Sequence, residues 1–551
     1  MADEEKKDTS SPVGVAEVDL GDVINTSGHV QELDRQFGFW SICAASLTID
    51  NAWGASAGSL TTALYDGGGP GVLYTFLVAC SFYCFIGAGL AELASAIPSS
   101  ASVYHWASVT SGKYGRVSSW YAGWWNYFAW NFGCASASLF GANAILGMYS
   151  LFHDGFVPDR WMIFIAYLGV TWMGCGIVLF GQRVLAKLTN AFGFLCLTIW
   201  LVSLLVVAIL PSTTGKGYAS HSFVWKDWNN QVGYSSNGFV FCLGMLNGAF
   251  GIGTPDGCTH LAEEIPDPKR NIPKGIVAQL VGGILTTFTF YIALLYAITN
   301  LDTVLDSAIP NLPLAAIYLQ ATNSNAGTCG LLVLFLIDIM VTLPGAYMTA
   351  SRMLWTLARD DALPYSSTFA HVSPRFRNPF ASTIACGCVS TILGCVYIGS
   401  TTAFNAFVGV FTILTTMSYL CALLPHLLTK RKYVIPGPFW MPPKVAYPVI
   451  GIACAYIIVF NIIYMFPYYL PTDAESMNYS CLLSGGLTIF VSLWYLWKRN
   501  HGYIGPMVAL EAKDDVQMVE GNLELEEKLD EKRRLEALKG LQARRSEVVA
   551  E

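Results

Sequence analysis

The sequence contains few charged residues. Aspartate, glutamate, lysine and arginine make up 13% of its 551 residues, whereas 54% are hydrophobic. Soluble globular domains contain about 25% charged residues, so the composition excludes an ordinary soluble protein. No polar segment between residues 37 and 500 is long enough to form a soluble domain of its own. We therefore expect an all-α polytopic membrane protein.

The motifs of several other protein classes are absent. The sequence has no CxxC pair, no His/Cys cluster, no HExxH and no GxSxG, and it lacks the paired aspartate motif of an intramembrane protease. We expect no metal site, no cofactor, no nucleic-acid partner and no enzymatic activity. A channel is disfavoured because no filter-like loop recurs.

Long hydrophobic runs are abundant, and a membrane-spanning helix needs about 20 apolar residues. Twelve such runs are centred near residues 38–63, 71–96, 117–148, 161–180, 186–210, 237–262, 275–299, 328–356, 381–399, 403–428, 445–467 and 479–497. The sequence therefore predicts a twelve-helix permease domain over residues 37–500.

Basic residues indicate the orientation. Lysine and arginine gather in the even-numbered turns, which include 113–116, 269–274, 352–377 and 430–444, whereas the odd-numbered turns hold only Arg160, Lys216 and Lys226. The positive-inside rule then places both termini in the cytosol. Residues 1–36 lack a signal peptide and are interpreted as a disordered arm. Residues 501–551 are interpreted as a charged tail, solvated or forming a short amphipathic helix.

The first and sixth hydrophobic runs are both interrupted near their middles. The first is broken at "TIDNAWGASAGS", where Asp50 and Asn51 precede Trp53 and Gly54, and the sixth at "FGIGTPDG", residues 250–257. Proline removes a backbone donor and glycine lowers helix propensity by about 1 kcal/mol. Unwound backbone at membrane depth is tolerated only inside protein or along a cavity. Matching breaks indicate an inverted-repeat transporter, although a simple kink with glycines for close packing is the alternative.

Two aspartates lie at these breaks, Asp50 and Asp256. A carboxylate within the membrane is costly and is usually functional. Either residue could attract a cationic solute or take up a proton, and Asp256 could instead cap the helix that follows. Trp53 beside the first break and Phe250 at the second offer aromatic faces for a cation. On the third run, Trp124, Tyr127 and Asn131 share one helical face, which is also the pattern of ordinary packing.

Further polar residues are candidates for gating or proton transfer. Glu92 is expected to pair with an arginine of an inner loop, as a structural residue or as a proton relay. His260 follows Asp256 by one turn and is a candidate proton partner. Glu263 and Glu264 lie where the sixth run meets the cytosol, and an ion pair with Lys269 or Arg270 is the simplest expectation.

Several linked motifs resemble the amino acid–polyamine–organocation superfamily. They are "GLAELASAIPSSASVYHWA", "ASRMLWTLARDDALPYSSTFAHVSP" and "PDGCTHLAEEIPDPKRNIPKGI". The last of these is similar to the fungal amino acid/choline branch, which includes choline and γ-aminobutyrate permeases. The resemblance implies a five-plus-five inverted repeat plus two helices, and alternating access with proton coupling.

The resemblance also implies the residues of the site. Residues 50–54 and 251–256, including Gly251, Gly253 and Thr254, would line it, while Glu92 and Arg352 would serve the scaffold or the gates. One departure is that amino acid permeases carry a GxG segment in the first helix for the substrate carboxylate, where this sequence has "TIDNAWG". That difference favours choline, γ-aminobutyrate or another small amine over α-amino acids.

The sequence thus predicts a secondary transporter that imports a small nitrogenous solute with protons across the plasma membrane. The motifs do not separate this function from an exporter, or from a vacuolar transporter of an amine or an alkaloid-like metabolite. A non-transporting nutrient sensor is a further alternative, for which a long signalling tail would be evidence.

Overall fold

The structure is a computed structural model that describes residues 38–506, except residues 154, 306–311, 377, 401, 475–476 and 504. The predicted tails, 1–36 and most of 501–551, lie outside the described residues. Within the described part the secondary structure is helical, apart from one isolated bridge between Ser373 and Asn378. The all-helical class predicted from the sequence is confirmed.

The helices follow one another along the chain with short connections. They are α2 (Phe39–Asp50), α3 (Ala52–Gly58), α4 (Leu60–Tyr65), α5 (Gly68–Ala96), α6 (Val103–Thr110), η1 (Gly112–Tyr114), α7 (Gly115–Ser150), α8 (Arg160–Thr213), α9 (His221–Trp225), α10 (Asn237–Gly251), η2 (Gly257–Glu264), α11 (Pro268–Ala297), α12 (Leu301–Leu305), α13 (Pro313–Thr322), α14 (Asn325–Arg359), α15 (Ser366–Phe369), α16 (Phe380–Gly399), α17 (Thr402–Leu428), α18 (Pro443–Ile463) and α19 (Ser480–Lys498).

Ten helical segments among the described residues are long and apolar enough to cross a membrane. Two of them, Arg160–Gln182 and Lys187–Thr213, belong to α8. A helix rises about 1.5 Å per residue, so the 54 residues of α8 form a helix far longer than one crossing of a hydrocarbon core about 30 Å thick. The first and sixth hydrophobic runs are missing from these ten because their helices are interrupted.

The first run is interrupted at Asn51. Helix α2 ends at Asp50 and α3 begins at Ala52, and Asn51 between them has left-handed backbone angles, φ 38° and ψ 55°. Asparagine is among the few non-glycine residues that adopt this conformation readily. A second irregularity, at Ser59, separates α3 from α4. The break predicted at Asp50 and Asn51 is confirmed.

The second interruption follows Gly251, where α10 ends. Regular helix resumes only at Gly257, as the 3₁₀ helix η2. Pro255 lies between them and has no amide proton to donate. A Cβ on Gly251 would collide with the Ser56 hydroxyl of α3. The sequence therefore breaks both helices where they cross.

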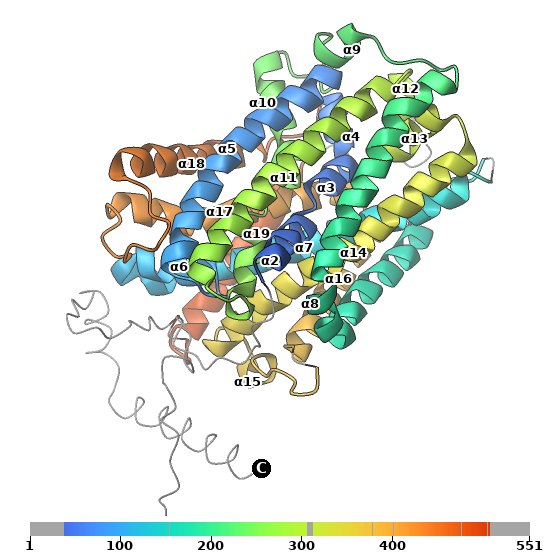
Figure 1. The fold of residues 1–551 in the computed structure, drawn as a ribbon. Helices are drawn as coiled ribbons and strands as arrows, with labels where there is room; N and C mark the ends of the chain where they lie inside the picture. The colour runs from blue at the N-terminus through green and yellow to red at the C-terminus, as the bar shows by residue number, and fades with distance from the viewer. Residues whose placement is uncertain are drawn as a thin grey trace, which may run out of the picture.

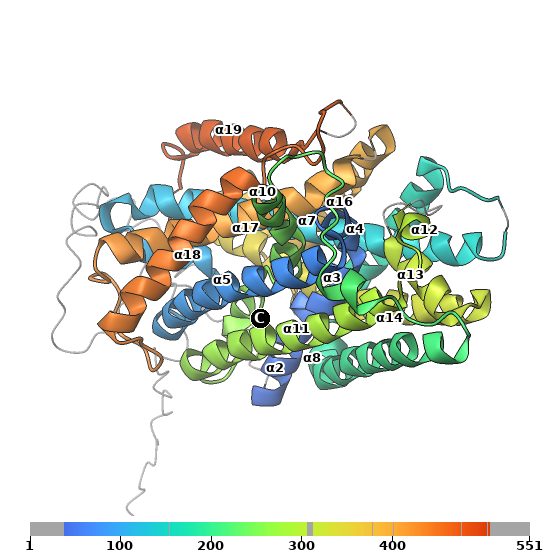
Figure 2. The same cartoon turned by 90° about the horizontal axis from the view of Figure 1, so that it is seen from above.

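The broken helices lie inside the bundle. Helix α2 packs against α8, α11 and α14, and α3 packs against α10 and α11. Figure 2 shows α19 along one edge of the bundle and α8 at the opposite side, with α3 between them. Figure 1 shows α9 and α12 at one end of the bundle and α15 at the other. We call these the α9 end and the α15 end.

Candidate substrate-binding site

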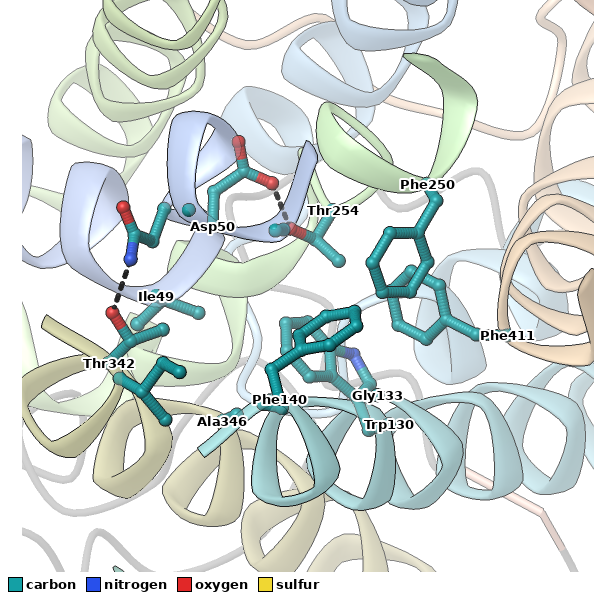
Figure 3. A pocket seen from close by; sticks show the side chains of 15 residues that line it. Ile49, Asp50, Trp130, Gly133, Phe140, Phe250, Thr254, Thr342, Ala346 and Phe411 are labelled. Atoms are coloured by element: carbon teal, nitrogen blue, oxygen red, sulfur yellow. Dashed lines mark hydrogen bonds between the residues drawn. The ribbon is translucent and has the colours of Figure 1, made fainter. Parts of the chain in front are cut away.

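A cavity lies where the two interrupted helices meet, deep in the bundle (Figure 3). The space between its walls, counted to its mouth, is about 600 Å³. Its lining residues are Ile49, Asp50, Asn51, Gly54, Ala55, Trp130, Gly133, Ala137, Phe140, Phe250, Thr254, Ile339, Thr342, Ala346 and Phe411. Residues of both breaks and of α7, α14 and α17 therefore form the walls of the cavity.

One side of the cavity is acidic. Asp50, the last residue of α2, accepts a hydrogen bond from the Thr254 hydroxyl at the second break. Thr254 is held in turn by Gln279 of α11, whose side-chain amide donates to the Thr254 carbonyl at 2.6 Å. Asp50 is 9% exposed, and no basic side chain of the described residues pairs with it. A buried carboxylate without a cationic neighbour favours a cationic ligand.

A second buried carboxylate is linked to the same break. The side-chain amide of Asn51 donates to Asp338 of α14, and also to the Thr342 hydroxyl at 2.9 Å. Asp338 is fully buried, and Cys196 of α8 lies beside it. Gly54 fits against this group because a Cβ there would lie 2.8 Å from both the Asn51 amide nitrogen and an Asp338 oxygen. The Asn51 backbone is therefore tied to α14 by its side chain.

The opposite side of the cavity is aromatic. Figure 3 shows the rings of Trp130, Phe140, Phe250 and Phe411 facing the side that carries Asp50 and Thr254. Phe250 lies edge-on to Phe411, with centroids 5.2 Å apart, and to Phe140 at 6.3 Å. Trp130 meets Phe411 at 6.4 Å. Rings arranged around a carboxylate are the usual recognition site for alkylammonium groups.

Five of the predicted site residues line this cavity: Asp50, Asn51, Gly54, Phe250 and Thr254. Their placement follows from the two breaks, which bring both segments to one depth in the bundle. These residues form the part of the candidate site that sequence patterns located.

Three other residues predicted at the breaks lie outside the cavity walls. Trp53 points away and packs edge-on against Phe290 of α11, with centroids 5.2 Å apart. Gly251 faces α3, and the Gly253 carbonyl accepts a hydrogen bond from the Tyr419 hydroxyl at 3.3 Å. Consecutive residues of a helix point in different directions, so proximity to a break does not bring each side chain to the cavity.

The third hydrophobic run contributes a different face from the predicted one. Tyr127 and Asn131 do not line the cavity, and the Asn131 amide donates to the Tyr127 carbonyl at 2.8 Å. The lining stripe is Trp130, Gly133, Ala137 and Phe140. Its spacing of three and four residues was visible in the sequence, but nothing there distinguished this face from its neighbour.

Asp256 lies behind the cavity rather than in its wall. Asn126 donates to it at 2.8 Å, the Tyr419 hydroxyl donates to its other oxygen, and His260 lies 3.2 Å away. All of these side chains are fully buried. The structure places His260 in contact with Asp256, while its role as a proton partner stays a prediction, and the aspartate holds the unwound segment against α7 and α17. No side chain caps the start of η2, so the alternative of side-chain capping by Asp256 is wrong.

Two ion pairs connect the C-terminal residues of η2 to α14, on the side of the α15 end. Arg352 binds Glu264 through two nitrogens at 3.1 and 2.9 Å, and Arg359 binds Glu263 at 3.1 Å. Arg352 is fully buried and Glu264 nearly so. The expected pairing of these glutamates with Lys269 or Arg270 is wrong, because the partners come from α14, which is distant in sequence.

Glu92 forms a similar connection nearby. Its carboxylate lies 2.9 Å from Arg431 and 3.1 Å from His426, and it accepts from the Met441 amide at 3.0 Å. Arg431 also stacks over Trp440, 3.9 Å from the ring centroid. The expected arginine partner of Glu92 is confirmed, and the residue joins α5 to the segment that follows α17.

The fold and the site define a membrane transporter. The sequence profile of the amino acid permease family matches residues 37–487, and the chain belongs to this family. The choline transporter of Saccharomyces cerevisiae is 28% identical over 488 residues, covering 88% of this chain and 84% of the relative. Amino-acid permease BAT1 of Arabidopsis thaliana is 26% identical over 509 residues, covering 89% and 97%. The transmembrane transporter swnT of Metarhizium robertsii is 28% identical over 450 residues, covering 80% and 87%.

These matches settle the class of protein. The chain is an integral membrane permease, and its family consists of transporters rather than enzymes. The superfamily predicted from the motifs is confirmed.

Proposed function

We propose that this permease imports a small organic cation, with choline as the leading candidate, and couples its uptake to protons. The observation that carries this proposal is the cavity with Asp50 on one side and four aromatic rings on the other. A carboxylate offers an ionic partner, and each ring face adds about 0.5–2 kcal/mol for a desolvated cation. Such a site suits a quaternary or primary ammonium group.

The same lining argues against an α-amino acid as the main substrate. An amino acid also carries a carboxylate, which needs a basic side chain or free backbone amides. None of the lining residues is lysine, arginine or histidine. γ-Aminobutyrate, whose charges lie farther apart, remains the comparison substrate for the uptake experiment. The name of the yeast choline transporter points in the same direction.

The transport cycle requires two helix breaks at the bilayer centre. Adding the two interrupted segments, α2–α4 and α10–η2, to the ten continuous ones gives twelve spans. With that numbering, α5 packs against α11, α7 against α14, and the first part of α8 against α16. Each pair consists of spans five apart, which supports a five-plus-five repeat. The α15 end, where the basic residues gather, faces the cytosol together with both termini.

Asp338 is the proton-coupling group in this proposal. It is buried against Asn51 and Cys196, and no basic side chain of the described residues neutralises it. An ionised carboxylate in that position is costly, so the group gains by binding a proton. Because Asn51 is the hinge between α2 and α3, the proton state of Asp338 changes how firmly the hinge is held. Asp256 and His260 have a structural role in this proposal: they hold the second break as Asp338 holds the first.

Uptake experiments test this proposal. Cells that lack their own permeases would express the protein with a fluorescent tag and receive radiolabelled choline, γ-aminobutyrate or an α-amino acid. We expect concentrative choline uptake at the plasma membrane, abolished by a protonophore and falling as external pH rises. Asp338→Asn should remove the pH dependence and the accumulation, while choline exchange across the membrane continues.

Four results would contradict the proposal. Uptake that needs sodium but ignores the protonophore would remove proton coupling. Tagged protein confined to the vacuole, or faster loss of preloaded choline from expressing cells, would favour the vacuolar transporter or the exporter. A choline-sensitive growth signal without any flux would favour a sensor.

A further inference from the structure

A second cavity lies toward the α9 end and shares no lining residue with the central one. Its walls are the end of α4, the middle of α10 and the segment between α18 and α19. The lining residues are Thr62, Asp66, Leu243, Leu246, Tyr464, Phe466, Tyr468 and Asn478. Asp66 is the only charged side chain among these eight.

Asp66 is a buried carboxylate without compensation. It follows the last residue of α4 and is 3% exposed, and its Oδ2 has no hydrogen-bond partner among the described residues. No basic side chain in the described part of the chain lies close enough to balance it. Among the described residues Asp50 and Asp338 also lack a basic partner, but each accepts a side-chain hydrogen bond, from Thr254 and from Asn51. Asp256 has several donors and Glu264 has Arg352. Burying an unpaired carboxylate is costly, so this carboxylate is stabilised either by a proton or by a cation that enters from outside the chain.

Aromatic side chains cover the carboxylate, and their segment is held in place. The Asn478 amide donates to the carbonyls of Tyr464 and Phe466 at 2.7 and 2.8 Å. The Tyr464 hydroxyl lies 3.0 Å from that of Tyr456 on α18. Farther along the segment, the Leu470 amide donates to the carbonyl of Val232 at 2.9 Å. Because the backbone is fixed, Tyr464, Phe466 and Tyr468 form a preorganised wall, as alkylammonium sites require.

The two cavities succeed one another along the broken helices. On α10, Leu246 lines the second cavity and Phe250, one turn later, lines the central one. Residues four apart on a helix share a face. On the other broken helix, Ala55 of α3 lines the central cavity, and Thr62 and Asp66, beyond the irregularity at Ser59, line the second. The second cavity therefore lies next to the central one, toward the α9 end.

We infer that Asp66, with Tyr464, Phe466 and Tyr468, forms an outer binding site for an alkylammonium cation, occupied before the solute reaches Asp50. The site is distinct from the one proposed for transport. Its capture of a cation does not depend on the proposed function, but its place before Asp50 on the route does.

Binding to the purified full-length protein in lipid nanodiscs tests the site, with tritiated choline as the probe. Asp50→Asn should retain choline binding at the outer site, and the double variant Asp50→Asn/Asp66→Asn should lose it. Asp302→Asn on the same background is the matched control, because Asp302 is an exposed carboxylate on α12 at the same end. Asp66→Asn alone should raise the KM of choline uptake by about tenfold with an unchanged maximal rate.

The inference would be overturned if Asp50→Asn and the double variant bound choline equally well, or if neither bound it. Asp66 would then hold only a proton. If the double variant fails to fold, Phe466→Leu on the Asp50→Asn background replaces it and should weaken choline binding. Normal uptake with an unchanged KM in Asp66→Asn would remove the site from the route while the proposed function stands. Choline binding lost only in the double variant, without any uptake by the wild type, would retain the site and reject the function.

Discussion

The carboxylate of Asp50 accepts a hydrogen bond from the hydroxyl of Thr254, which joins the two interrupted helices side chain to side chain. The two residues are 204 positions apart in the chain. Neither could hold this position in a continuous helix, because both lie where the helical winding stops. A bound cation at Asp50 would therefore act on both helices at once.

Asp50→Asn should reduce choline uptake by about tenfold or more, because the amide keeps the shape of the side chain and removes its charge. Radiolabelled uptake, divided by the surface amount of tagged protein, measures the effect. Thr254→Val is the companion variant and should leave partial uptake, since the charge remains and only one hydrogen bond is lost. Normal uptake by Asp50→Asn would remove this residue from the binding site.

Phe411→Leu should weaken choline binding by about two- to thirtyfold, the range expected for the loss of one cation–π contact. The measurement is competition of choline against a labelled ligand, repeated with the neutral analogue in which carbon replaces nitrogen. The neutral compound should bind the wild type and the variant about equally. Trp53→Phe is the control, because Trp53 packs against Phe290 outside the cavity. If Phe411→Leu weakened the binding of choline and of its neutral analogue equally, the aromatic residues would contribute only the shape of the cavity.

Glu264→Gln should lower the stability of the protein by about 3–5 kcal/mol, because it leaves the buried guanidinium of Arg352 without its anion. Thermal unfolding in detergent reports the change. Adding Arg352→Met should recover part of the loss, since no charge then remains unpaired. The control is Asp267→Asn, whose exposed contact with Arg270 at 4.0 Å should contribute little. If the losses of stability in the two single variants add up in the double variant, the ion pair contributes no energy that depends on both residues.

Gly251→Ala should destabilise the protein by about 1–3 kcal/mol, because its methyl group would occupy the position of the Ser56 hydroxyl. The Ser56 hydroxyl has no hydrogen-bond partner in the part of the chain that the structure describes, so Ser56→Ala alone should cost little. Combined with Gly251→Ala, it should partly restore folding and uptake. Fluorescence-detected size-exclusion chromatography after heating measures both variants. Without any recovery, the glycine would be needed for its backbone rather than for the close approach of α3 and α10.

The two aspartates of the breaks show how far sequence patterns reach. Both were recognisable because charge, glycine and proline within a hydrophobic run are costly unless they have a purpose. Asp50 faces the cavity and Asp256 lies behind it among Asn126, Tyr419 and His260. This difference depends on α7 and α17, which no pattern around residue 256 describes.

Two residues of the site were missed, Phe411 in the cavity wall and Asp338 beside Asn51. Phe411 lies in a hydrophobic run far from either break, and its sequence neighbours carry no signal of a site. Asp338 is a carboxylate within a hydrophobic run, which is a signal that could have singled it out. Helix packing brings Phe411 against Gly133, where a Cβ would lie 2.8 Å from its ring, and brings Asp338 to Asn51. Only the relative rotation of the helices decides which residues of a long apolar helix face the cavity.

The sequence by itself determined that this chain is a membrane protein, which segments are helical and where two of the helices break. The length of a hydrophobic run and the backbone preferences of glycine and proline are local properties. The sequence also placed one carboxylate at each break. The tertiary structure alone decided which acid faces a solute, which rings surround it and which arginines hold the glutamates of η2. Those outcomes depend on contacts between segments hundreds of residues apart, and such contacts are fixed by how the helices pack.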